Sequence, residues 1–240
     1  MSNSLNDRLS AYADIAAALS VDAVALVPGP NFTRAVDHAF MSHERPFVLV
    51  IPARGPAAAL VPNLELGSWD LVGFDGAVFD WRDQTGYDDA FAALTEHLNI
   101  TSLAVEGQVM RVFVHHALKK AQPDLRIIDA EREISAPRMI KTEAEVAALQ
   151  EAINISERAL RATLDSVKLG QTEKEIEQKL VQMVFAEGAD DLSFAPIVAA
   201  GDGSARPHAK ARENYRVKAG DALLIDFGAR KNGFAADITR

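Results

Sequence analysis

The sequence contains no cysteine. This absence excludes disulfide bonds, zinc sites built on thiolates, and catalysis by a cysteine nucleophile. Any metal that the protein binds must therefore be held by oxygen and imidazole ligands. Such ligands suit manganese, cobalt, iron or zinc.

Positive charge and long apolar runs are also scarce. The chain has 25 Lys and Arg against 34 Asp and Glu, and its formal net charge is −9. An acidic surface argues against non-specific binding to nucleic acid. No run approaches the roughly 20 apolar residues of a membrane span, so no membrane partner is expected. Met1 is followed by Ser-Asn-Ser rather than by a basic and then apolar stretch, so we expect a cytoplasmic protein.

What is present is typical of a globular protein with one or two domains: 240 residues, 48% hydrophobic and 25% charged. In the first half, helical and strand patterns alternate, which predicts an α/β layer structure. Residues 130–138 are expected to form a linker after it. The expected helices cover residues 5–19, 87–98 and 108–121, and the expected strands cover residues 24–27, 47–51, 58–61, 102–105 and 125–128.

The second half opens with two helices that have matching start signals. Thr142 with Glu145, and Thr172 with Glu175, each fit a capping box, in which side chain and backbone satisfy each other's hydrogen bonds. Apolar residues at helical spacing follow both boxes. We expect these helices to pack on a sheet.

The last residues predict a β-hairpin with Asn-Gly at 232–233, the residue pair that tolerates positive φ at both central turn positions. With this pair at the centre, Asp226 faces Thr239 and Gly228 faces Asp237. Directly paired residues share a face, and each strand repeats every two residues. Asp226 and Asp237 are therefore expected on the same face as diagonal neighbours.

Two ionised carboxylates about 5 Å apart repel by ~3 kcal/mol at an effective dielectric constant near 20. A shared proton or a bound cation offsets such repulsion. The alternative is that Asp226 and Asp237 are both solvated on an edge hairpin. A register slip of one residue would send the two side chains to opposite faces and remove the argument for a site.

The hairpin resembles the pita-bread metallopeptidases, a family that includes Xaa-Pro aminopeptidases, prolidases and methionine aminopeptidases, with creatinase as a relative without metal. Residues 194–208 (FAPIVAAGDGSARPH) are similar to the strand and loop that deliver a substrate-side histidine in that family. Residues 138–145 and 218–221 also agree with it. The resemblance covers about residues 136–240, while residues 1–134 resemble the amino-terminal domain of the prolidase branch in size and alternation.

This resemblance implies an α/β and α+β fold in two domains: an amino-terminal creatinase/prolidase-like domain over residues 1–134, and the first half of a pita-bread catalytic domain over residues 135–240. It also implies two divalent metal ions (manganese, cobalt, iron or zinc) held by Asp226 and Asp237 together with a His and two Glu. Those three ligands have no counterpart before Arg240. We therefore expect an incomplete catalytic unit that is inactive on its own.

The implied function is metal-dependent cleavage of short peptides by an Xaa-Pro aminopeptidase or dipeptidase, in which His208 hydrogen-bonds the substrate carbonyl or the reaction intermediate. A homodimer is expected, because dimers are usual in the family. Two alternatives remain open at this point. One is a creatinase-like hydrolase that cleaves a C–N bond without metal, and the other is a non-catalytic pita-bread module that binds peptides or proteins.

Overall fold

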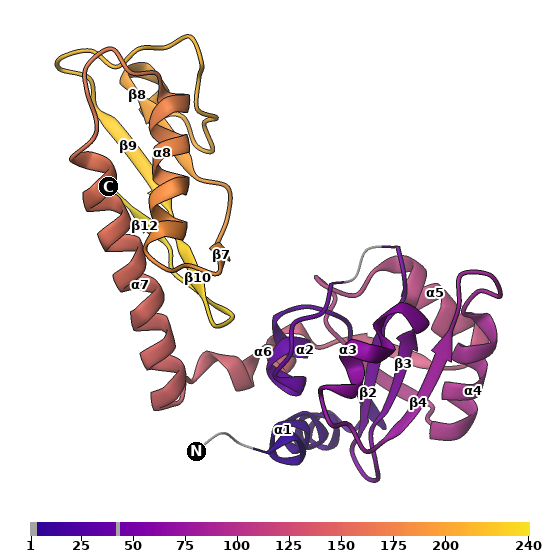
Figure 1. Ribbon diagram of the computed structural model, residues 1–240. Helices are drawn as coiled ribbons and strands as arrows, with labels where there is room; N and C mark the ends of the chain where they lie inside the picture. The colour runs from indigo at the N-terminus through magenta and orange to yellow at the C-terminus, as the bar shows by residue number, and fades with distance from the viewer. Residues whose placement is uncertain (1–3, 42–43) are drawn as a thin grey trace. The chain divides into compact units, whose positions relative to one another are not determined.

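The structure is a computed structural model that describes residues 4–41 and 44–240. It consists of two compact units, Met1–Ile140 and Lys141–Arg240 (Figure 1). Within the described residues, no helix has the length and apolar content needed to span a membrane.

The first unit is built on a six-stranded mixed sheet with the strand order β4-β3-β2-β1-β5-β6. Strand β1 pairs antiparallel with β2 and parallel with β5, and β2 pairs antiparallel with β3. The elements are α1 (Leu5–Ala18), β1 (Ala23–Leu26), α2 (Pro30–Val36), β2 (Val48–Pro52), β3 (Ala58–Pro62), η1 (Asn63–Glu65), α3 (Leu66–Asp70), β4 (Ala77–Trp81), α4 (Asp88–Leu98), β5 (Ser102–Val105), α5 (Val112–Ala121), β6 (Arg126–Asp129) and α6 (Glu131–Met139).

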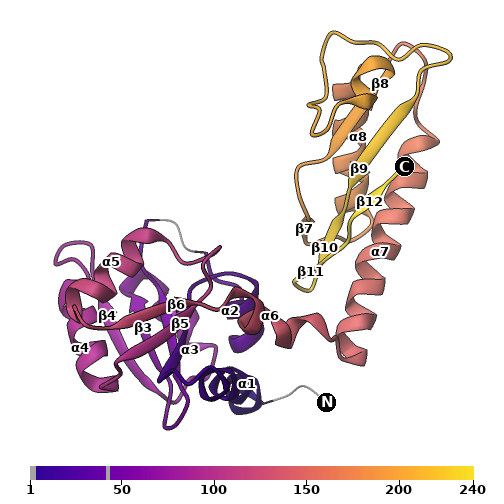
Figure 2. The same ribbon diagram turned by 180° about the vertical axis from the view of Figure 1, so that it is seen from behind.

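Both faces of this sheet are covered, and the core is divided between them. Along β1, Val24 and Leu26 pack in one apolar cluster with α1 and α2, whereas Ala23 and Ala25 pack in a second cluster with α4 and α5. Figures 1 and 2 show these helices on either side of the strands. Because both faces are buried, β1, β2, β3 and β5 are apolar at nearly every position instead of alternating with polar residues. The expected α/β layer structure is confirmed.

The expectation of a linker over residues 130–138 is wrong. These residues form α6, whose Ile134 is fully buried in the core of the first unit. Two acidic residues in its first turn favour the helix start, and the Asp129 side chain accepts a hydrogen bond from the backbone N–H of Glu131 at 3.0 Å. Pro137 is accommodated near the end of the helix.

The second unit packs two helices on a small antiparallel sheet. Both helices begin at the capping boxes expected from the sequence, at Thr142 and Thr172. The strands form two three-stranded groups, β12-β9-β8 and β11-β10-β7. The elements are α7 (Glu143–Leu164), α8 (Glu173–Ala186), β7 (Asp191–Leu192), β8 (Ile197–Ala200), η2 (Gly201–Ala205), β9 (Leu223–Phe227), β10 (Ala229–Lys231), β11 (Phe234–Ala235) and β12 (Ile238–Thr239).

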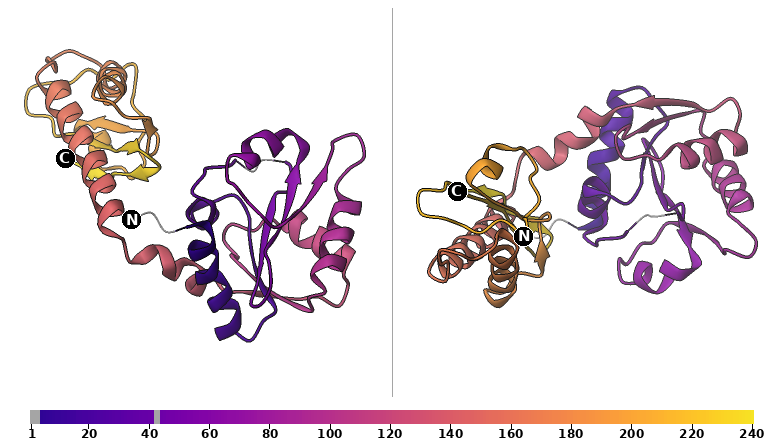
Figure 3. Two further views of the ribbon diagram at one scale, coloured as in Figure 1. Left: turned by 60° about the horizontal axis from the view of Figure 1, so that its bottom comes forward. Right: turned by 90° about the horizontal axis from the view of Figure 1, so that it is seen from above.

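Helices α7 and α8 cover one face of this sheet, as the right-hand view of Figure 3 shows. Residues Ile225, Phe227 and Ala229 point into the apolar core that the helices make with the sheet. The alternation of strand residues therefore places Asp226 on the face away from α7 and α8.

Candidate functional site

The hairpin at the end of the chain has the turn and register expected from the sequence. Asn232 and Gly233 have φ of 50° and 80°, the left-handed values that a tight hairpin turn of this kind requires. On either side of the turn, Lys231 pairs with Phe234. The Asn-Gly pair thus sets the register of everything that follows.

The same register continues as far as the two aspartates. Phe227 pairs with Ile238 and Asp226 pairs with Thr239, without a bulge between the turn and these pairs. Asp237 directly precedes β12, in the short stretch between β11 and β12. If the alternation of β12 extends by one residue, Asp237 shares a face with Thr239 and is a diagonal neighbour of Asp226. This face is the one opposite the two helices.

The strand that carries Asp226 is interrupted at Gly228, between β9 and β10. A Cβ atom on Gly228 would lie 1.7 Å from the carbonyl oxygen of Ala236, which lies between β11 and β12, so the two backbones approach too closely for any side chain. The Gly228 carbonyl accepts a hydrogen bond from the backbone N–H of Ser193 at 2.8 Å. A glycine is therefore required beside the aspartates for a packing reason.

The two aspartates differ in their surroundings. Asp226 is half-buried, and its Oδ1 atom is buried without a hydrogen-bond partner among the described residues, whereas Asp237 is exposed. A buried carboxylate oxygen that lacks a donor is costly, and a cation or a proton removes that cost. The carboxylate pair therefore fits a divalent cation that prefers oxygen ligands.

The described part of the chain does not contain a complete metal site. Within it, no group of three or more His, Asp or Glu side chains is arranged to hold a metal ion. His208 consequently does not join Asp226 and Asp237 as a third ligand. Two carboxylates alone provide only part of the coordination that a divalent ion requires.

His208 lies in the exposed part of the long loop between η2 and β9. Its backbone has φ of 55°, which places a non-glycine residue in the left-handed region. This conformation is unfavourable for a residue with a Cβ atom, and surrounding contacts must hold it. The strain was not predicted from the sequence.

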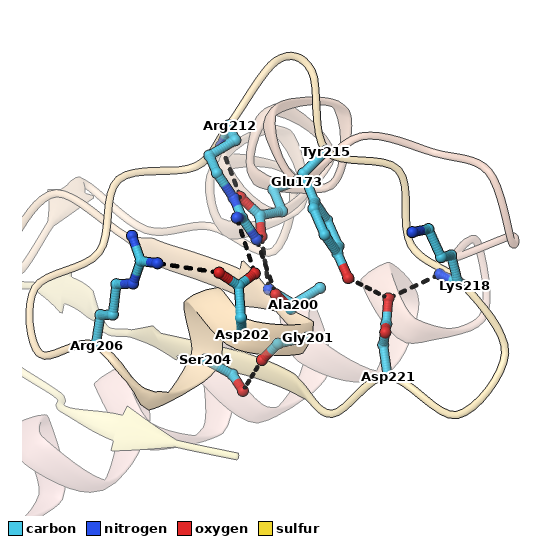
Figure 4. A network of polar contacts seen from close by, with 10 residues as sticks. All are labelled: Glu173, Ala200, Gly201, Asp202, Ser204, Arg206, Arg212, Tyr215, Lys218 and Asp221. Carbon is cyan, nitrogen blue, oxygen red and sulfur yellow. Dashed lines mark hydrogen bonds and ion pairs between the residues drawn. The ribbon is translucent and has the colours of Figure 1, made fainter.

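The largest group of polar contacts in the second unit was not predicted from the sequence either. It centres on Glu173, the first residue of α8, whose side chain is fully buried. Figure 4 shows how its carboxylate faces Arg212 and the end of β8. Glu173 forms an ion pair with Arg212 at 2.7 Å and also accepts hydrogen bonds from the backbone N–H groups of Ala200 and Arg212, at 2.7 and 2.8 Å.

These contacts explain the charge state of Glu173. Burial alone would raise its pKa, but the hydrogen bonds from the Arg212 side chain and from the backbone of Ala200 and Arg212 outweigh burial and lower the pKa. The same interactions raise the pKa of Arg212. Both groups are therefore ionised over the whole physiological pH range.

The contacts extend from Arg212 along the loop. Its guanidinium donates to Asp202 Oδ1 at 3.0 Å and lies 4.0 Å from the centre of the Tyr215 ring. The Tyr215 hydroxyl donates to Asp221 at 3.0 Å, which raises the tyrosine pKa. Gly201 is the sequence signal that could have indicated this arrangement, since a Cβ atom there would lie 2.2 Å from the Tyr215 hydroxyl.

A cavity of about 510 Å³ lies in the first unit, where β1 and β5 end. Its lining is mainly apolar and none of the predicted site residues belongs to it. The lining residues are Val27, Pro28, Gln108, Val109, Met110, Arg111, Val112 and Val114.

Comparison with known proteins agrees with this division of the chain. Residues 8–140 match the creatinase/prolidase N-terminal domain, and residues 147–240 match metallopeptidase family M24. The first matched range and the first compact unit both end at residue 140, beyond the boundary after residue 134 that the sequence suggested. The chain belongs to the family of proteins with a creatinase/prolidase N-terminal domain, and its second unit is similar to metallopeptidase family M24.

Individual relatives support this assignment. An Xaa-Pro dipeptidase of Pyrococcus furiosus is 32% identical over 143 residues, which are 59% of this chain and 40% of that protein. The crystal structure of a prolidase from Thermococcus sibiricus matches with a TM-score of 0.90 at 27% identity, over 100% of this chain and 65% of that one. An X-Pro aminopeptidase from Thermotoga maritima matches with a TM-score of 0.74 at 28% identity, over 95% and 64%.

The chain thus spans less than two thirds of the length of each of these proteins. The expected fold class is confirmed: an amino-terminal α/β domain is followed by part of a pita-bread domain. The resemblance to prolidases and Xaa-Pro aminopeptidases is confirmed with it.

Proposed function

We propose that this chain forms part of a metal-dependent peptidase that cleaves short peptides, as an Xaa-Pro dipeptidase or aminopeptidase. The observation that carries the proposal is the hairpin register, in which Asp226 pairs with Thr239, two residues after Asp237. The unpartnered Oδ1 atom of Asp226 supports it, because this oxygen needs a positive partner. The similarity of residues 147–240 to metallopeptidase family M24 supports the class of reaction.

In this proposal, Asp226 and Asp237 hold divalent metal together with ligands from outside these 240 residues. Manganese, cobalt, iron and zinc are the candidates. Bound metal supplies a Lewis acid and lowers the pKa of water at the site. The two aspartates contribute negative charge, Asp226 from strand β9, which is a more rigid support than a loop, and Asp237 from the residue directly before β12.

His208 is the proposed substrate contact. An imidazole N–H at this place would donate a hydrogen bond to the peptide carbonyl and stabilise the negative charge that develops on its oxygen. The exposed position of His208 leaves it accessible to a substrate. The proposal retains the homodimer, the cytoplasmic location, and the inactivity of the 240 residues taken alone.

The test uses the protein produced from its whole reading frame. We expect elemental analysis to find divalent metal, and a chelator to abolish hydrolysis of an Xaa-Pro dipeptide or of a longer Xaa-Pro peptide. The double variant D226N/D237N is expected to lose both metal and activity. The matched control is D75N, which neutralises an exposed aspartate in the first unit.

Each other outcome identifies a different function. Turnover that persists without metal would favour a creatinase-like hydrolase and contradict the proposed mechanism. Bound peptide without turnover in the metal-loaded protein would favour a binding module. Cleavage of the dipeptide alone would assign a dipeptidase, whereas cleavage of the longer peptide would assign an aminopeptidase.

A further inference from the structure

The loop that carries His208 is closed at its base by a single buried carboxylate. Oxygen Oε1 of Glu173 accepts from the backbone N–H of Ala200, where the loop leaves β8, and Oε2 accepts from the backbone N–H of Arg212, where the loop returns. These distances are 2.7 and 2.8 Å. Two points of the backbone that are far apart along the loop are thus fixed to the start of α8.

The Arg212 side chain also links the two ends of the loop, through Glu173 and the carbonyl group of Ala200. Its Nε and Nη2 atoms donate to Glu173 at 2.9 and 2.7 Å, and Nη2 also donates to the carbonyl oxygen of Ala200 at 2.9 Å. A planar guanidinium makes such a set of bonds at once, whereas a lysine ammonium on a flexible chain does not reproduce the geometry. Gly203 leaves room for it, because a Cβ atom there would lie 2.7 Å from Nη2.

The first half of the loop is supported from within. Asp202 bridges the base to the loop, since its carboxylate pairs with Arg212 and with Arg206, each at 3.0 Å. The backbone N–H of Arg206 donates to the carbonyl oxygen of Gly203 at 3.1 Å. Figure 4 shows this series of contacts from Glu173 through Arg212 and Asp202 to Arg206, two residues before His208.

His208, whose backbone is strained, follows two residues after Arg206, the last residue in this series of contacts. Its φ of 55° is held only if the surrounding loop restricts other conformations. We propose that Glu173 and Arg212 are a positioning pair that fixes the loop of residues 201–211 and thereby the place of His208 in the site. The inference rests on the proposed function of His208, but neither Glu173 nor Arg212 is assigned a contact with substrate.

The test compares R212K and E173Q with the unaltered protein produced from its whole reading frame. R212K keeps the charge and loses the planar fork, and E173Q keeps the shape and loses the ion pair. The control is R161K on α7, where the exposed Arg161 pairs with the neighbouring Glu157 at 3.5 Å, far along the chain from the loop. Circular dichroism first establishes that each variant is folded.

Hydrogen exchange in the loop is the measurement that does not depend on activity. We expect amide exchange over residues 201–212 to accelerate at least tenfold in R212K and in E173Q, with unchanged exchange in R161K. In a sample labelled at histidine, the backbone signal of His208 is expected to shift in the first two variants only. Unchanged exchange in both variants would overturn the proposal, whether or not the protein is a peptidase.

Kinetics then separate positioning from general stability. On the Xaa-Pro substrate, R212K is expected to lower kcat at least tenfold with KM changed less than twofold. In an H208A background, R212K is expected to lower kcat by less than twofold, because its effect acts through His208. If R212K lowered kcat by the same factor with His208 present and in the H208A background, the proposal would be overturned. Absence of turnover in the unaltered protein would refute the proposed function, and the exchange measurement would still decide the role of the pair.

Discussion

Ser156 on α7 and Ala229 on β10 are joined by a hydrogen bond in which the Ala229 backbone N–H donates to the serine Oγ at 2.9 Å. Ser156 in turn donates to the carbonyl oxygen of Ala152 at 2.9 Å, and both Ser156 and Ala229 are fully buried. The bond lies directly after the interruption at Gly228. Helix α7 thus satisfies a buried backbone N–H of β10, the strand that directly follows the one that carries Asp226.

The substitution S156A is expected to lower the free energy of unfolding by about 1–3 kcal/mol, because the buried N–H of Ala229 loses its acceptor. Urea unfolding of the purified protein measures this change. The control is S10A, which removes an exposed hydroxyl that donates within its own helix, to the carbonyl oxygen of Asp7. Equal midpoints for S156A and the unaltered protein would show that the bond contributes nothing to stability.

The close approach at Gly228 predicts a larger effect for G228A. The new Cβ atom would lie 1.7 Å from the Ala236 carbonyl oxygen, so the two strands must separate. We expect a loss of more than about 3 kcal/mol, since a backbone neighbour has no rotamer with which to move aside. Thermal unfolding checks it against G67A, where the structure leaves open space and a small gain of about 0.5 kcal/mol is expected. A G228A protein as stable as G67A would contradict the close contact between these strands.

The features that could be predicted from the sequence are those that depend on neighbouring residues. The Asn-Gly turn sets the hairpin register, and each capping box lies within four residues, so one short segment contains the whole signal. The alternation of Ile225, Asp226 and Phe227 likewise predicts which side chain is buried and which faces away. The proposed role of both aspartates depends on local patterns of this kind.

The features that the sequence did not predict depend on residues far apart. Glu173 is 39 residues from Arg212, and nothing in the helix start at Thr172 indicates that partner. Similarly, α6 contains Pro137 and is mostly polar, so its segment has the composition of a linker. Its one buried residue, Ile134, is stabilised by the tertiary core. Contacts between distant parts of the chain, and not local sequence preference, therefore determine both the pairing of Glu173 with Arg212 and the formation of α6.

Another such feature is the buried carboxylate of Glu106 at the end of β5. Glu106 and Asn31 are almost completely buried, and the amide of Asn31 donates to Glu106 Oε1 at 2.6 Å. The second oxygen of each side chain, Oε2 and Oδ1, is buried without a partner among the described residues. Burial raises the pKa of Glu106, which the bond from Asn31 offsets only in part and the charge of Glu131 reinforces.

The substitution E106Q is expected to stabilise the protein at neutral pH by about 1 kcal/mol, because glutamine is neutral and carries a donor where one oxygen has no partner. The pH dependence of this stabilisation follows from the raised pKa of Glu106. Stabilisation by protonated Glu106 is complete below the ordinary glutamate pKa of about 4.3 and is lost as the pH rises through the folded-state value. The advantage of E106Q in thermal unfolding should therefore be small at pH 4 and grow towards pH 7.

The matched control for this site is E106A, which removes the acceptor of Asn31 and is expected to lose about 1–3 kcal/mol at every pH. A stability difference between E106Q and the unaltered protein that stays constant from pH 4 to pH 7 would contradict a raised pKa for Glu106. Loss of stability in E106Q at pH 7 would show that a carboxylate is required there.

The candidate metal site predicts opposite effects of one substitution with and without metal. In metal-free protein, D226N removes a charge whose Oδ1 atom lacks a partner among the described residues. In the proposed arrangement, this charge also repels Asp237. Water screens the exposed Asp237, so the expected gain is about 1 kcal/mol. Added Mn²⁺ or Zn²⁺ at 100 times its dissociation constant should stabilise the unaltered protein by about 2.7 kcal/mol, and this gain should disappear in D226N.

Thermal unfolding with and without metal, after treatment with chelator, measures both effects of D226N in the protein from the whole reading frame. In D75N, which changes the net charge equally at an exposed site, metal should stabilise as in the unaltered protein. Equal stabilisation by metal in D226N would place the ion elsewhere, because the substituted amide is a weaker ligand than the carboxylate. A metal-free D226N that is less stable than the unaltered protein would mean that Asp226 serves the fold instead of a cation.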